Sequence, residues 1–266
     1  MPAVTREPLF GRRLAVVYDV NGPRVRLGVL WIAAVAAALQ VGPAGVAAVY
    51  AAAAGLAGWQ TLEAWKSRRS DANQWVGAAG AALLPLAAVV SAQLLGAAIL
   101  VLAFLAVAVT LAAPGKADRA HVLAAAGLTV QSSLFVGLAG ASIVLAIRLD
   151  IAAAVVLVLF VAAYEVGDFL VGSGAGNAWE GPAAGIAAIA ALGLCAAVLR
   201  VAPFDGADVW TFAALAAVAC PLGQVAASVL LPAADAHAPA LRRLDSLLVL
   251  GPAWAALIGL YLSRVA

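Results

Sequence analysis

The sequence predicts an all-α, polytopic integral membrane protein with about nine transmembrane helices. Of its 266 residues, 66% are hydrophobic and only 11% are charged, and the mean hydropathy is +1.07. Average chains carry roughly 25% charged residues, and one bilayer-spanning helix needs about 20 apolar residues. Apolar runs such as 97–113 lack the alternation, every second residue, that a transmembrane β-barrel requires.

The first four helices are expected from two double-length apolar runs. The run 27–58 is too long for one span and is divided at Gly42 and Pro43, because proline has no backbone N–H and disfavours continuation of a helix. The run 75–113 is predicted to hold two helices that meet near residues 93–96. Five single spans are then expected at 121–147, 151–171, 182–199, 208–231 and 246–263.

Basic residues predict the orientation. Cytoplasmic loops of membrane proteins carry an excess of Lys and Arg. With nine spans and a cytoplasmic N-terminus, only Arg148, Arg200 and Arg264 of the 15 basic residues fall on the outer side. The loops 172–181 and 232–245 then both face the cytoplasm, where a nucleotide is available.

The chain is divided into a basic cytoplasmic N-terminal segment, 1–26, and a single transmembrane helical domain, 27–266. The N-terminal segment carries arginines but no small-residue cleavage site, so we expect no cleaved signal peptide. Cys195 and Cys220 lie in apolar runs without a CxxC spacing and are expected to be structural thiols. The net charge of +2 gives no indication of nucleic-acid binding.

Two carboxylates sit near the predicted cytoplasmic end of one span. Glu165 and Asp168 are three residues apart and therefore share a helix face. Carboxylates at membrane depth are costly unless they are solvated, paired or bound to a metal. The pair indicates a cation site or the lining of a polar cavity; contact with interfacial water is the alternative.

A second polar region covers residues 221–246. Gln224 and Ser228 share one helix face at i, i+4 spacing, and His237 fits a general base, a metal ligand, a phosphate donor or a solvated loop residue. Arg242 and Arg243 suit phosphate, because the guanidinium fork matches phosphate oxygens, although they also satisfy the positive-inside rule.

Asp245 stands at the start of the last predicted span. A carboxylate there fits either an N-cap of that helix or a metal ligand. Residue types alone leave both alternatives open.

The two polar regions together resemble the phosphatidate cytidylyltransferase (CDP-diacylglycerol synthase) family of membrane enzymes. The segment GWQTLEAW, from residue 58, is similar to a glutamate-bearing segment of that family. The other matched positions follow the order of the family motifs A-Y-x-x-G, W-E-G, G-D-x-x-E-S and H-G-G-x-L-D-R-x-D-S: Ala163, Tyr164, Gly167, Trp179, Glu180, Gly181, Gly223, Ser228, His237, Leu241, Arg243, Asp245 and Ser246.

The departures from the family pattern fall on reactive positions. Phe160 and Gln224 stand where the motifs have aspartates, Ala227 replaces a glutamate, and Arg242 replaces the first aspartate of L-D-R-x-D. Joining CTP to phosphatidate brings two highly charged phosphates together, and divalent cations that stabilise such oxygens need carboxylate ligands. An arginine in place of a carboxylate repels a metal and attracts phosphate.

Three functional alternatives follow from the resemblance. The leading expectation is a non-catalytic protein with the cytidylyltransferase-type membrane fold, which binds an anionic phospholipid or serves as a partner subunit in phospholipid metabolism and needs no cofactor. A divergent, active CTP-dependent nucleotidyltransferase, which makes CDP-diacylglycerol and pyrophosphate with Mg²⁺, is the second. A small-solute transporter or membrane scaffold is the third.

The resemblance also implies roles and partners. Asp245 and His237 would be catalytic, and Asp245, Glu165 and Asp168 would hold the metal. Residues expected to contact substrate are Arg242, Arg243, Trp179, Glu180, Ser228 and Gln224. Expected partners are an anionic phospholipid, CTP if the protein is active, and a second copy or another membrane protein, but no nucleic acid.

Overall fold

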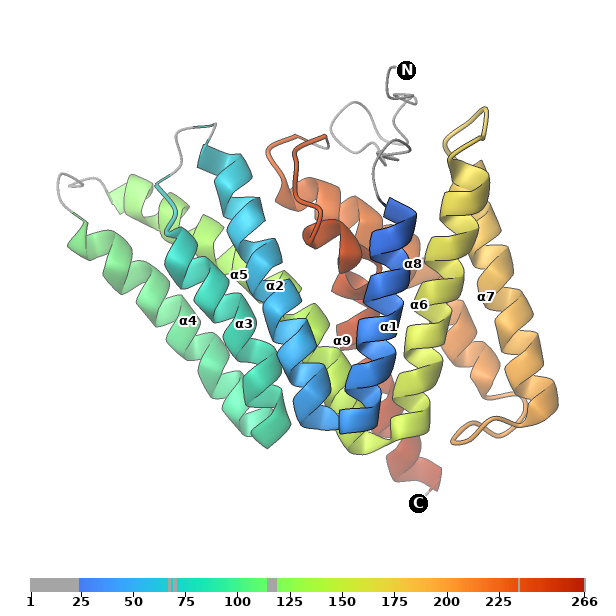
Figure 1. Ribbon diagram of the computed structural model, residues 1–266. Coiled ribbons are helices and arrows are strands. Elements are labelled where there is room, and N and C mark those ends of the chain that lie inside the picture. Colours follow the sequence, from blue (N-terminus) through green and yellow to red (C-terminus); the bar gives the residue numbers. More distant parts are fainter. Residues whose placement is uncertain (1–23, 67, 69–70, 114–118, 234, 266) are drawn as a thin grey trace.

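The computed structural model describes residues 24–66, 68, 71–113, 119–233 and 235–265 (Figure 1). Across these residues the chain is helical and has no strand, which confirms the predicted all-α class. The N-terminal segment up to residue 23, with its arginines, lies outside the described residues. The described helices are α1 Arg24–Val41, α2 Pro43–Lys66, α3 Gln74–Val90, α4 Ala92–Ala112, α5 Arg119–Leu149, α6 Ile151–Gly172, α7 Glu180–Leu199, α8 Val209–Leu230, the 3₁₀ helix η1 Leu241–Arg243, and α9 Asp245–Val265.

The first predicted helix break is confirmed and the second is displaced. Gly42 separates α1 from α2 with a φ of 92°, a conformation that glycine adopts without a steric penalty. The break between α3 and α4 falls at Ser91 and not at residues 93–96. Ser91 ends one helix in an extended conformation, and its hydroxyl accepts a hydrogen bond from Leu94 N (3.0 Å) at the start of the next. This N-cap bond outweighs the weaker helix-breaking tendency of Gly96.

Six of the described helices, α4 to α9, are long and apolar enough to cross a bilayer. Their length and composition make the chain a multi-pass membrane protein. The residues Gly28–Val41 of α1 and α3 form shorter apolar helices. Most of the surface of α4 and α7 is exposed, as expected of helices that face lipid, whereas α5 is the most deeply buried span.

Successive helices run in alternating directions, so every second connection lies at the same end of the bundle (Figure 1). The end at the top of Figure 1, called here the loop end, carries the start of α1, the α6–α7 connection and the segment 231–244 between α8 and α9. Helix α5 packs against α2, α3, α4 and α9 and forms the centre of the bundle. The two predicted loops therefore do lie on the same side.

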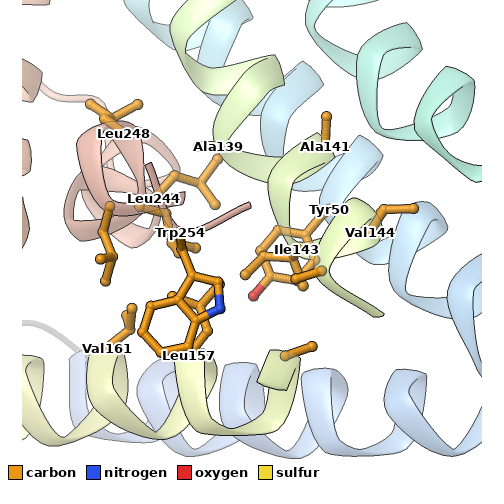
Figure 2. Packing of buried hydrophobic residues seen from close by; sticks show 14 of the residues in the cluster. Tyr50, Ala139, Ala141, Ile143, Val144, Leu157, Val161, Leu244, Leu248 and Trp254 are labelled. Atoms are coloured by element: carbon orange, nitrogen blue, oxygen red, sulfur yellow. The ribbon is translucent and has the colours of Figure 1, made fainter. Parts of the chain in front are cut away.

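Aromatic side chains fill the core between the helices. Trp254 of α9 is fully buried, and its ring centroid lies 4.9 Å from that of Phe212 and 5.9 Å from that of Phe160. Figure 2 shows Trp254 among Tyr50 of α2, Leu157 of α6 and Ile143 of α5. Burial of these large rings holds helices from both halves of the chain together.

Glycines allow two helix pairs to approach closely. A β-carbon at Gly185 of α7 would lie 2.6 Å from the ring of Tyr164, and one at Gly167 of α6 would lie 2.8 Å from the carbonyl oxygen of Ala184. A β-carbon at Gly223 of α8 would overlap the backbone carbonyl of Asp245. Small residues at such crossings let transmembrane helices pack backbone to backbone.

We expect Gly223→Ala to lower the free energy of unfolding by about 1–3 kcal/mol, because the added methyl group meets rigid backbone at the α8–α9 crossing. Denaturant titration of the purified protein in detergent micelles measures this change. The matched control is Gly127→Ala in α5, where a β-carbon meets nothing within 4 Å; alanine's better helix propensity should leave that variant unchanged or slightly more stable. Equal stability of both variants would contradict the close crossing.

Candidate functional site

A buried hydrogen-bond network joins α6 to α8 near the loop end. The hydroxyl of Tyr164 donates to Gln224 Oε1 (3.0 Å), and Gln224 Nε2 donates to Asp168 Oδ2 (3.0 Å). All three side chains are buried. Because Nε2 must donate to the carboxylate, the amide orientation is set and Oε1 is left to accept from the phenol. Gln224 stands where the resembled motif has an aspartate. It carries no charge, and its amide forms hydrogen bonds with both Tyr164 and Asp168.

Arg242 reaches this network through Ser228. The Arg242 Nη1 donates to Ser228 Oγ (3.1 Å), and that hydroxyl donates to the backbone carbonyl of Gln224 (3.1 Å). Ser228 is buried and Arg242 is half-buried. The structure therefore brings together three of the predicted substrate-contacting residues. We call Gln224, Ser228 and Arg242, together with Tyr164 and Asp168, the polar cluster.

Asp245 and Arg243 flank the polar cluster. Asp245 is the first residue of α9 and is buried, and its Oδ1 accepts from the backbone N of Ser246 (2.7 Å). A carboxylate in the first turn of a helix is stabilised by the helix dipole. Arg243 is half-buried and lies against α1, since a β-carbon at Gly28 would be 3.5 Å from its Nη1.

Glu165 lies one position from Tyr164 on α6 and is half-buried. Its carboxylate is within electrostatic reach of Tyr50 on α2 and of Cys220 on α8, and Asp245 is likewise within reach of Cys220. Glu165 of α6 and Asp245 of α9 therefore both act electrostatically on Cys220 of α8.

Trp179, Glu180 and His237 have no hydrogen bond to the polar cluster among those that the structure describes. Trp179 is 64% exposed in the α6–α7 connection. Glu180 begins α7 and accepts hydrogen bonds from Asn177 Nδ2 (2.8 Å) and Gly176 N (3.3 Å) within that connection. In Figure 1 this connection stands well away from the segment that carries Arg242. His237 is exposed in the segment 231–240.

The donor set does not fit a divalent cation. Within the described part of the chain, no three His, Cys, Asp or Glu side chains are grouped so that they could hold a metal ion. Asp168 accepts from an amide and Asp245 from a backbone N–H, and the guanidinium of Arg242 occupies the position next to Ser228. Hard cations such as Mg²⁺ need several oxygen ligands converging on one point, and the polar cluster does not supply that arrangement.

The end of α2 contacts the segment 231–244, a contact that the sequence did not predict. Trp65 donates to the carbonyl of Leu230, just before this segment, and Gln60 accepts from the backbone N–H of Ala240 within it. Both residues belong to the stretch GWQTLEAW, and its similarity to a family segment was the only available signal. Local periodicity carries no information about such a long-range contact.

Neither a family model nor a curated protein matches this chain.

The polar cluster makes a stability prediction. Gln224→Leu should lower the free energy of unfolding by about 1–3 kcal/mol, because it removes both partners' hydrogen bonds to the amide inside the bundle. Tyr164→Phe, which deletes only one bond, should cost about 0.5–1.5 kcal/mol. Thermal unfolding in detergent measures both effects.

The double variant and a surface control complete this test. Tyr164→Phe should add little in the Gln224→Leu background, since the bond it deletes is already gone. Gln93→Leu on the exposed start of α4 should leave stability unchanged. Additive losses would show that Tyr164 and Gln224 do not interact.

Proposed function

We propose that this protein is a non-catalytic relative of the membrane cytidylyltransferases that binds the phosphate headgroup of an anionic phospholipid at Arg242. The observation that supports this most directly is the bond from Arg242 Nη1 to Ser228 Oγ, 3.1 Å long, over a buried amide–carboxylate pair. The guanidinium stands where the resembled motif has an aspartate. Arg242 is half-buried, and it lies close to the start of the last span. The ends of membrane-spanning helices lie near the phospholipid headgroups.

The chemistry of the polar cluster favours phosphate over a metal. A planar guanidinium with five N–H donors matches the oxygens of a phosphate, and Arg243 adds a second positive charge one residue away. Ser228 adds a hydroxyl that can both donate and accept. The carboxylate of Asp168 accepts from the side-chain amide of Gln224, whereas Ser228 donates to the backbone carbonyl of the same residue.

The proposal includes a topology. In it, α1, α2 and α3 join α4 to α9 as spans, which makes nine, and the loop end faces the cytoplasm. Among the described basic residues, Lys66, Arg68, Arg119, Arg242 and Arg243 lie at or near the loop end, whereas Arg148, Arg200 and Arg264 lie at or near the opposite end. Anionic lipids of the cytoplasmic leaflet attract each nearby Lys or Arg by about 1 kcal/mol.

Lipid binding is tested with the purified protein in nanodiscs of phosphatidylcholine that contain a small fraction of phosphatidate. We expect Arg242→Ala to weaken phosphatidate binding at least about tenfold, as expected for loss of a charge-assisted hydrogen bond, and Arg242→Asp to abolish it. Arg264→Ala, an exposed arginine at the far end of α9, is the matched control and should bind normally. Unchanged binding by Arg242→Asp would overturn the proposal.

The same preparation tests catalysis. With CTP, Mg²⁺ and phosphatidate we expect no pyrophosphate release and no CDP-lipid. Clear turnover that is lost in Asp245→Ala would replace the proposal with the active-enzyme alternative. Proton-coupled solute uptake that is lost in Glu165→Gln would instead favour a transporter.

Single-cysteine labelling tests the topology. In a background with Cys195→Ser and Cys220→Ala, Asp235→Cys should react only with reagent on the cytoplasmic side, and Asp205→Cys only with reagent on the outer side. Both aspartates are exposed, and they lie in connections at opposite ends of the bundle. Labelling of both positions from one side would contradict the topology.

A further inference from the structure

The segment between α8 and α9 is attached at its first end to α2. Trp65, near the end of α2, donates from its indole Nε1 to the carbonyl oxygen of Leu230 (2.8 Å). Leu230 is the last residue of α8. The last carbonyls of a helix receive no hydrogen bond from an N–H group of the same helix. The indole therefore satisfies a carbonyl that the helix leaves open, at the point where the chain departs toward Arg242.

The second end of the segment is attached to the same helix. The backbone N–H of Ala240 donates to Gln60 Oε1 (2.9 Å), a contact between residues 180 apart in sequence. Ala240 occupies the N-cap position of η1. In a capping box, the side chain that satisfies this N–H comes from the same helix, three residues on. Here, the side chain is supplied by α2.

These two attachments determine where Arg242 lies. Arg242 follows Ala240 by two residues, and its own N–H donates to Ala238 O (3.2 Å). Leu241 and Leu244, on either side of the arginine pair, are fully buried. The backbone of η1 is thus held by Gln60 on one side and by its buried leucines on the other, and from this backbone Arg242 reaches Ser228.

We propose that Gln60 and Trp65 are positioning residues that hold the segment 231–240 in place and thereby orient Arg242 toward the polar cluster. This inference rests on the proposed function for its consequence, which is tighter phosphate binding. The attachment itself is independent of any ligand, and this separates the two in the experiment below.

Trypsin reports on the attachment directly, since it cleaves after Arg242 and Arg243. With the protein in nanodiscs, cleavage at these two sites is followed by mass spectrometry of the C-terminal fragment. We expect Trp65→Phe, which keeps an aromatic ring but lacks the N–H, and Gln60→Leu, which lacks the acceptor, each to accelerate this cleavage about tenfold, because each variant loses a hydrogen bond that resists local opening. Gln60→Glu retains an acceptor and should restore the slow rate.

Trp75→Phe is the matched control. Trp75 is 75% exposed and packs edge-on against Trp59, at 4.6 Å between ring centroids. Its replacement should leave cleavage after Arg242 unchanged. Thermal unfolding is measured in parallel, so that a general loss of stability is distinguished from local release of the segment.

Phosphatidate binding supplies the second arm. If both ideas hold, Gln60→Leu weakens binding several-fold while Gln60→Glu does not. If wild-type protein binds no phosphatidate but the cleavage rates change as expected, the proposed function fails and the attachment stands. The inference would be overturned if Gln60→Leu and Trp65→Phe were both cleaved, and both bound phosphatidate, as the wild-type protein does. This holds even if Arg242→Ala loses binding.

Discussion

Inside a bundle whose outer surface is suited to lipid, a buried polar group is costly unless it finds a partner within the protein. The amide of Gln224 meets this requirement for α6 and α8 at once, since it accepts from Tyr164 and donates to Asp168. Ser228 continues the same row of polar groups one turn further along α8 and receives Arg242. This row comes from the second half of the chain, and α2 of the first half reaches the neighbouring segment through Trp65 and Gln60.

Close helix crossings explain several positions that match the family motifs. Gly167 and Tyr164 of α6 lie at the crossing with α7, and Gly223 of α8 lies against the start of α9. The two glycines let the helices approach closely, and the ring of Tyr164 packs against α7. The positions that depart from the motifs are those where an active enzyme would need carboxylates. The proposed function would account for this pattern, in which packing positions match the motifs and charged positions do not.

Helix α2 links the central bundle to the segment that carries the arginines. It packs along α3 and α5 over most of its length, while its last two turns extend to the backbone on both sides of the segment 231–240. Among residues 231–233 and 235–240, Leu231 is the one large aliphatic side chain, so little hydrophobic burial holds this part of the chain. Side-chain bonds from a rigid helix supply the missing constraint.

Much of the helical layout follows from the sequence alone, because polar residues separate the apolar runs and hydrophobic length sets each span. The last five helices begin and end within about two residues of their predicted positions. The helix break at Gly42 was also predictable from the sequence. The position of the break at Ser91 depended on one hydroxyl that caps the next helix. The common face of Gln224 and Ser228 was also predictable, since helix geometry is local.

Only the tertiary structure decided which groups form the site. It brought Asp168 to Gln224 and Arg242 to Ser228, but left Trp179 and Glu180 in a connection that stands away from the segment with Arg242. Spacing along one helix gives the direction of a side chain but not the helix that it will meet. That choice depends on how all the spans pack around α5, and packing is a property of the whole chain.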